Sequence, residues 1–104
     1  MIKQVKIDQV VYDVAETKGP IIVGHVECKG DIDYNNNLIE LLVPAGDGQK
    51  DVTLMHEIVH GMIYERSLQD MIVADRMETF VDEMGKSILG LIRSNPNLIK
   101  YLLK

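Results

Sequence analysis

The spacing of hydrophobic residues changes once along the chain, from alternation before residue 45 to helical spacing after residue 49. Alternating apolar and polar positions are typical of half-buried strands. Strands are predicted at 5–7, 10–14, 21–28, 30–34 and 38–43. Turns are predicted where these segments are interrupted, at 8–9, 18–20 and 35–37. Pro44 ends the last strand, and a short loop follows over 45–48.

Two amphipathic helices are predicted in the rest of the chain, over 49–65 and 68–93. The apolar stripe of the first comprises Val52, Met55, Val59, Met62 and Ile63. The stripe of the second comprises Ala74, Met77, Val81, Met84, Ile88 and Leu91 or Ile92. Asn95 and Pro96 are a good cap and first turn for a short last helix through Leu102.

Strands that all precede helices indicate an α+β fold. We expect a small N-terminal antiparallel sheet, two packed helices and a short C-terminal helix. The length of 104 residues predicts a single domain over 1–104.

The first predicted helix contains an HExxH run, His56-Glu57-Ile58-Val59-His60. Residues i and i+4 of a helix differ by about 40° of rotation and roughly 6 Å of rise, so two imidazoles can converge on one ion. This is half of a zinc hydrolase site, in which Glu57 is the expected general base. The alternative is that both histidines are core residues that form hydrogen bonds with backbone groups.

A catalytic zinc needs a third protein ligand, and carboxylates of the second helix offer one. Glu78 lies next to the apolar stripe and is favoured by spacing, and Asp82 is the alternative one turn later. Asp75, Glu83 and His25 are weaker candidates, the first two because they point outward and the last because it lies on a predicted strand.

Two other residues share the face of the expected ligands. Tyr64 follows His60 by one turn, and its hydroxyl is a candidate donor to the oxyanion of a transition state. Its alternative role is an aromatic that packs with its hydroxyl in water. Thr53 precedes His56 by one turn and is a candidate for supporting a ligand through a hydrogen bond.

Charge and cysteine content exclude several classes of function. The net charge of −5 is spread evenly over the two halves of the chain, which argues against direct nucleic-acid or anionic-membrane binding. Cys28 is the single cysteine, so no internal disulfide can form, which fits a reducing cytoplasm. No signal-like segment starts the chain, and no apolar run approaches the length of a membrane span.

Residues 53–60 (TLMHEIVH) resemble the T-x-x-H-E-x-x-H segment of the ImmA/IrrE family of zinc metallopeptidases, and residues 78–85 (ETFVDEMG) resemble its E-x-x-A-N-x-F-A helix. Residues 30–34 and 38–41 resemble the strands before this motif in small phage and prophage members. The chain departs from the family in having Val59 before the second histidine and Val81-Asp82 in place of Ala-Asn.

The resemblance implies an intracellular metallopeptidase encoded by a phage or mobile element, with Zn²⁺ held by His56, His60 and Glu78. It implies a protein or peptide substrate, which in known cases is a repressor bound to DNA. The runner-up function is a non-catalytic regulatory or protein-binding module stabilised by metal. A zinc hydrolase acting on RNA is weaker, because no third histidine follows His60 and the chain is acidic.

Overall fold

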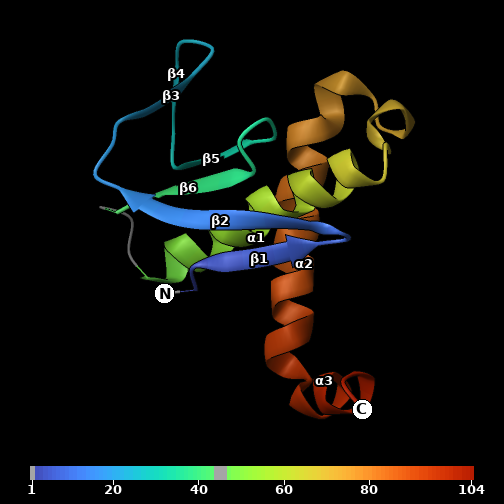
Figure 1. Cartoon of the computed structure of the whole chain (residues 1–104). Helices are drawn as coiled ribbons and strands as arrows, with labels where there is room; N and C mark the ends of the chain where they lie inside the picture. Colours follow the sequence, from blue (N-terminus) through green and yellow to red (C-terminus); the bar gives the residue numbers. More distant parts are fainter. Residues whose placement is uncertain (1, 44–46) are drawn as a thin grey trace.

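The computed structural model describes residues 2–43 and 47–104, and in these residues strands precede helices (Figure 1). The fold is α+β, as the hydrophobic pattern predicts. The main sheet has the order β1-β2-β6-β5, formed by β1 (Gln4–Ile7), β2 (Val10–Thr17), β6 (Leu38–Leu42) and β5 (Gly30–Asp33). A second sheet is the hairpin of β3 (Ile21–Val23) and β4 (Val26–Cys28). Pro44, the predicted end of the last strand, and positions 45–46 of the predicted loop lie outside the described residues.

The main sheet is mixed, which corrects the expectation of an antiparallel sheet. β1 pairs antiparallel with β2, and β5 pairs antiparallel with β6, but β2 and β6 run parallel, with Val14 opposite Ile39. The reason is that residues 18–37 include the β3–β4 hairpin and β5, which return the chain to the same end of the sheet before β6 begins. This direction places Ile39 and Leu41 in one buried cluster with Tyr12 and Val14.

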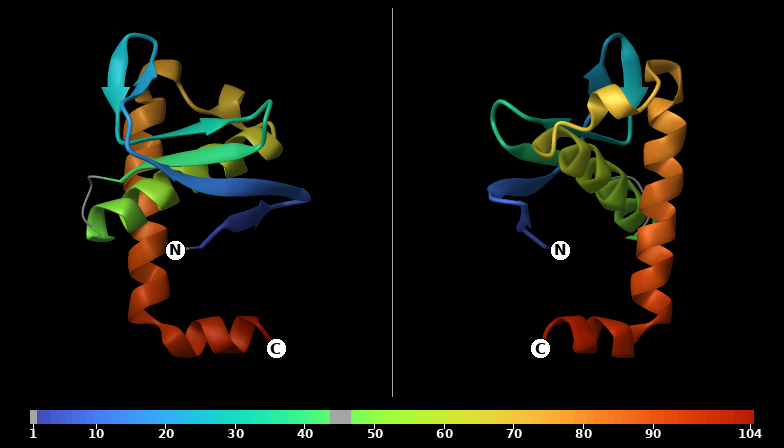
Figure 2. Two further views of the ribbon diagram at one scale, coloured as in Figure 1. Left: turned by 60° about the vertical axis from the view of Figure 1, so that its left-hand side comes forward. Right: turned by 90° about the vertical axis from the view of Figure 1, so that its right-hand side faces the viewer.

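Helix α1 (Asp47–Glu65) is the central layer of the molecule, between the sheet and α2 (Met77–Ser94), as the right-hand view of Figure 2 shows. Leu54 and Ile58 pack against the core of the sheet. Val59 and Ile63 pack against Val81 of α2. A helix with a layer on each side needs two apolar faces instead of one stripe, and for this reason the predicted stripe residue Met62 is 42% exposed.

The predicted second helix begins at Met77, nine residues later than the sequence pattern indicates. The intervening segment holds two 3₁₀ turns, Gln69–Met71 and Ala74–Arg76, and Ile72 and Val73 between them have extended backbones. Ile72 packs against the cluster between the two helices. The chain is therefore extended instead of helical at Ile72, where the β-branched side chain reaches the core.

Helix α2 packs on α1 through Val81, Gly85 and Ile88, and Arg93 in its last turn pairs with Asp51 of α1, although α2 continues beyond the body of the molecule (Figure 1). Val81 is fully buried, whereas Leu91 and Ile92 of the predicted stripe are exposed. The short helix α3 (Pro96–Leu102) follows after Asn95, as predicted. Within the described residues, every helix falls short of the length and apolarity that crossing a bilayer requires.

Candidate metal centre

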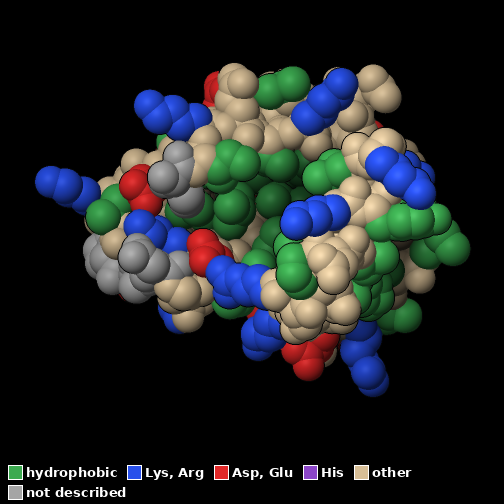
Figure 3. Space-filling model, turned by 90° about the horizontal axis from the view of Figure 1, so that it is seen from below, with side chains coloured by type: hydrophobic (Ala, Val, Ile, Leu, Met, Phe, Trp, Pro, Cys, Tyr) green, Lys and Arg blue, Asp and Glu red, His purple; other side chains and the backbone are tan. Residues whose placement is uncertain are grey.

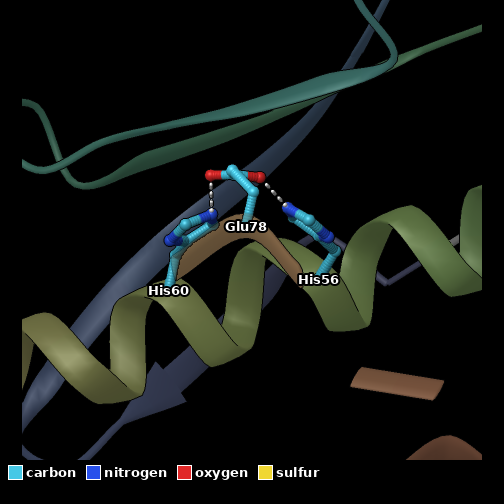
Figure 4. Close-up of side chains that lie close together, drawn as sticks. All are labelled: His56, His60 and Glu78. Atoms are coloured by element: carbon cyan, nitrogen blue, oxygen red, sulfur yellow. Dashed lines mark hydrogen bonds and ion pairs between the residues drawn. The ribbon is translucent and has the colours of Figure 1, made fainter. Parts of the chain in front are cut away.

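His56 and His60 lie one turn apart on α1, and both rings point toward the same carboxylate (Figure 4). The Nε2 atom of His56 is 3.0 Å from Oε2 of Glu78, and Nε2 of His60 is 2.9 Å from Oε1. Glu78 belongs to the first turn of α2, which carries this carboxylate across to α1. The structure thus brings together the three residues that the sequence singles out as ligands.

The donor set of this cluster suits a metal ion. One ligand atom from each of His56, His60 and Glu78 lies within 4.8 Å of the other two. Two imidazoles and one carboxylate form a common protein ligand set for catalytic zinc, which leaves a position open for water or substrate. Burial lowers the pKa of His60, although Glu78 opposes the shift, and the neutral ring keeps a lone pair for a metal.

Glu57 lies on the same helix but is buried, with only 6% of its surface exposed. Its carboxylate lies against Gly30 of β5, where an added Cβ would be 3.4 Å from Oε2 of Glu57 and 2.5 Å from the methyl group of Thr53. A residue without a side chain at position 30 therefore lets β5 approach α1 closely. Burial, with contributions from Asp31 and Glu78, raises the pKa of Glu57 to about 8.

Asp82 lies on the other side of the His56 ring and is not part of the three-residue cluster. Its Oδ1 is 3.6 Å from Nδ1 of His56, and its Oδ2 accepts a bond of 2.9 Å from Nζ of Lys86. The Lys86 ammonium lowers the pKa of Asp82. A carboxylate facing the second ring nitrogen of a ligating histidine orients the ring and fixes its tautomer, so Asp82 is placed for support instead of ligation.

The other candidates from the sequence lie outside the cluster. His25 is in the β3–β4 turn with a φ of 67°, and not on a strand as expected. Asp75 and Glu83 are exposed, in keeping with the outward direction predicted for them. Thr53 is buried, and its hydroxyl accepts a hydrogen bond of 3.3 Å from Gln49, so its contacts join α1 to β5 and do not support a histidine.

Tyr64 stacks on a second tyrosine, Tyr34, with ring centroids 4.0 Å apart and planes 6° from parallel. Tyr64 is 44% exposed, and it is Tyr34 that lines the cleft beside the cluster. Burial, followed by the negative charges of Glu57 and Asp31, raises the pKa of Tyr34 to about 12. The sequence prediction missed Tyr34, because its position after β5 gives no sign that the chain returns to α1 there.

A cleft of about 630 Å³ contains the cluster. Its walls come from α1, the start of α2, the edge strand β5 and the β3–β4 hairpin. Asp31 of β5 also lines the cleft, and burial raises the pKa of its carboxyl. The sequence prediction missed Asp31 as well, although a charged residue inside the predicted strand 30–34 is a signal that could have drawn attention to it.

Comparison of the chain with models of protein families, with curated proteins and with solved structures gives no match.

Proposed function

We propose that the chain is a zinc-dependent metallopeptidase that hydrolyses a peptide bond in a protein or peptide substrate. The observation that carries the proposal is the convergence of His56, His60 and Glu78 in a cleft that also holds the buried carboxyl group of Glu57. Neither helix alone supplies this arrangement, because Glu78 comes from α2.

Zinc bound in this cluster would supply a Lewis acid for the scissile carbonyl and would lower the pKa of a water molecule to about 7. Glu57 is the group that takes the proton of the attacking water and delivers it to the leaving amine. Its contact with Gly30 fixes the carboxylate within the cleft. Tyr34, which lines the same cleft, is a hydroxyl donor for the oxyanion, and Tyr64 holds the Tyr34 ring by stacking.

The edge strand β5 offers a way to hold an extended peptide. β5 pairs with β6 on one side in the main sheet, and Gly30, Asp31 and Ile32 line the cleft with the cluster. An unpaired strand edge binds a peptide through main-chain hydrogen bonds, which position it without regard to its sequence. The resemblance to ImmA/IrrE peptidases adds a cytoplasmic repressor as a candidate substrate.

Metal content and hydrolysis together test the proposal. We expect about one zinc per chain by mass spectrometry in the wild type and in Asp82→Ala, and loss of zinc in Glu78→Ala. Glu83→Ala is the matched control, because Glu83 is an exposed carboxylate on the same helix outside the cluster. Glu57→Gln should keep zinc but lose peptide hydrolysis by a factor of about 10² to 10⁴. Full activity in that variant would refute the mechanism.

The second candidate function is a binding module that uses metal only for stability. The modest number of buried hydrophobic residues where α1 meets α2 favours this reading, because a ligand from each helix would join the two layers. A zinc-loaded protein that cleaves no peptide, but unfolds at a much lower temperature after chelation, would support this function instead of the peptidase.

A further inference from the structure

The β3–β4 hairpin is the wall of the cleft with the least support from the rest of the fold. Its strands pair with each other, and its main packing partner is β5. Figure 2 shows the hairpin standing above the main sheet, beside the N-terminal end of α2. An isolated two-stranded hairpin is marginally stable in water. Apolar side chains that are exposed on it bury little area, so the stability of the fold does not explain why these positions are apolar.

The register of the hairpin sorts its side chains into two faces. Ile21 lies opposite Cys28, and Val23 lies opposite Val26. Directly opposite residues share a face, and successive residues alternate between faces, so these four side chains form one apolar face. Ile22 lies on the other face, with its partner Glu27. We call the first of these the valine face.

The valine face is the one turned toward the cluster, because both Val23 and Cys28 line the cleft. Exposure increases along it, from Ile21 at 7% to Val23 at 45% and Val26 at 61%. The opposite wall of the cleft is polar and carries the metal-ligating cluster. Two exposed valines beside charged groups gain free energy when an apolar group covers them.

We infer that the valine face is a specificity pocket for an apolar side chain of a peptide held along β5. This inference rests on the proposed function, and it adds the class of substrate. Lys29 alone separates β4 from β5, so the valine face continues into the strand edge that would bind the peptide. A strand added at that edge directs alternate side chains to one face, so one of its residues reaches the valines.

The charges of the cleft further restrict the class of peptide that is expected to bind. Asp31, Glu57, Glu78 and Asp82 line it with a single lysine, Lys29. When ionised, these four carboxylates exceed the combined charge of Lys29 and a bound Zn²⁺ by one unit, so the expected ligand is an extended, non-acidic segment with an aliphatic side chain next to the scissile bond. Discrimination of roughly tenfold or more is typical of a hydrophobic pocket for a side chain of this size.

Peptide binding by zinc-loaded Glu57→Gln protein tests the pocket without turnover. The probes are two fluorescein-labelled decapeptides that differ only in a central Leu or Ser, with affinity measured by fluorescence anisotropy. The double variant Val23→Thr/Val26→Thr keeps the shape and β-branching of both side chains but adds hydroxyl groups. Ile22→Thr is the matched control on the opposite face of the same hairpin.

We expect the double variant to lose roughly tenfold in affinity for the Leu peptide and little for the Ser peptide. Ile22→Thr is made, like the double variant, in the zinc-loaded Glu57→Gln protein, which is the parent of both. It should bind both peptides as this parent does. Equal binding of the Leu and Ser peptides by the parent, an unchanged Leu-peptide affinity in the double variant, or the same loss in Ile22→Thr would overturn the inference.

The outcomes for pocket and peptidase can be told apart. If the wild type hydrolyses neither peptide, but Leu-peptide binding depends on Val23 and Val26, the pocket stands and the peptidase proposal fails. If the wild type cleaves both peptides with the same kcat/KM, the peptidase stands and the pocket fails. If the zinc-loaded Glu57→Gln protein with both valines intact binds neither peptide, the pocket is overturned, whatever the hydrolysis assay gives.

Discussion

At the scale of single residues, Glu57 is as buried as a core side chain, and the proposed mechanism uses its carboxyl group as the general base. A carboxylate in such surroundings loses the solvation that water gives its charge, and Asp31 and Glu78 add repulsion. In the metal-free protein its pKa is raised from 4.5 to about 8, so the folded state holds a proton that the unfolded chain releases. A bound cation would favour the charged form and oppose this shift.

This pKa shift predicts how the stability of the metal-free protein depends on pH. Between pH 4.5 and pH 8 the folded state binds more protons than the unfolded state, so the free energy of unfolding falls as pH rises. We expect Glu57 to contribute a loss on the order of 3 kcal/mol by pH 7. Glu57→Gln removes this contribution, so after chelation the variant should be increasingly more stable than the wild type from pH 5 to pH 8. A stability difference in urea unfolding that stays constant over this range would contradict the prediction.

At the scale of elements, the crossing of α1 and α2 determines whether the proposed metal ligands meet. The helices cross at Gly85, where an added Cβ would lie 3.2 Å from the backbone nitrogen of His56 and 3.3 Å from its Cα. Glu78 lies two turns earlier on α2. A side chain at position 85 would therefore push Glu78 and His56 apart.

Two glycine variants of α2 separate helix propensity from this close approach. Gly90→Ala has nothing within 4 Å of the new methyl group, so it should raise the free energy of unfolding by about 0.5–1 kcal/mol and leave zinc affinity unchanged. Gly85→Ala should gain less than Gly90→Ala and should bind zinc more weakly in competition with a chelator. Equal stability and zinc affinity in the two variants would show that the crossing tolerates the methyl group.

At the scale of the whole molecule, the C-terminal part of the chain differs from the body in both packing and charge. Residues 84–104 contain four basic residues and no acidic ones, although the whole chain carries a net charge of −5. From below, hydrophobic side chains line a hollow with Lys and Arg side chains around it (Figure 3). Tyr101, Leu102 and Leu103 are each more than half exposed.

Among the described elements, α3 packs substantially only on α2, so the proposed metal centre should not depend on it. We expect deletion of residues 96–104 to leave zinc content unchanged and to lower Tm by no more than a few degrees. Zinc content by mass spectrometry and a thermal melt followed by circular dichroism measure the two effects. Loss of zinc from the shortened protein would show that α3 supports the fold over a longer range than its contacts indicate.

Local periodicity explains why much of the fold could be predicted. Alternation around Val10, Tyr12 and Val14 and the helical spacing of His56 and His60 follow from the geometry of the strand and helix that contain them. Helical spacing also ranked Glu78 above Asp82, because Glu78 lies beside the apolar stripe, between Met77 and Val81, and so can face the neighbouring helix. These features need no knowledge of distant contacts.

Contacts between layers account for what the sequence left undetermined. The parallel direction of β2 and β6, the loss of helix at Ile72 and Val73, and the return of Tyr34 to the cleft each depend on segments far apart in the chain. The sequence by itself determined the order of strands and helices and the spacing of the two histidines, because both are fixed by local backbone geometry. Only the tertiary structure decided that Glu78 meets those histidines, that Glu57 is buried against Gly30 and that Val23 and Cys28 line the cleft, because each needs two layers to pack at one particular distance and angle.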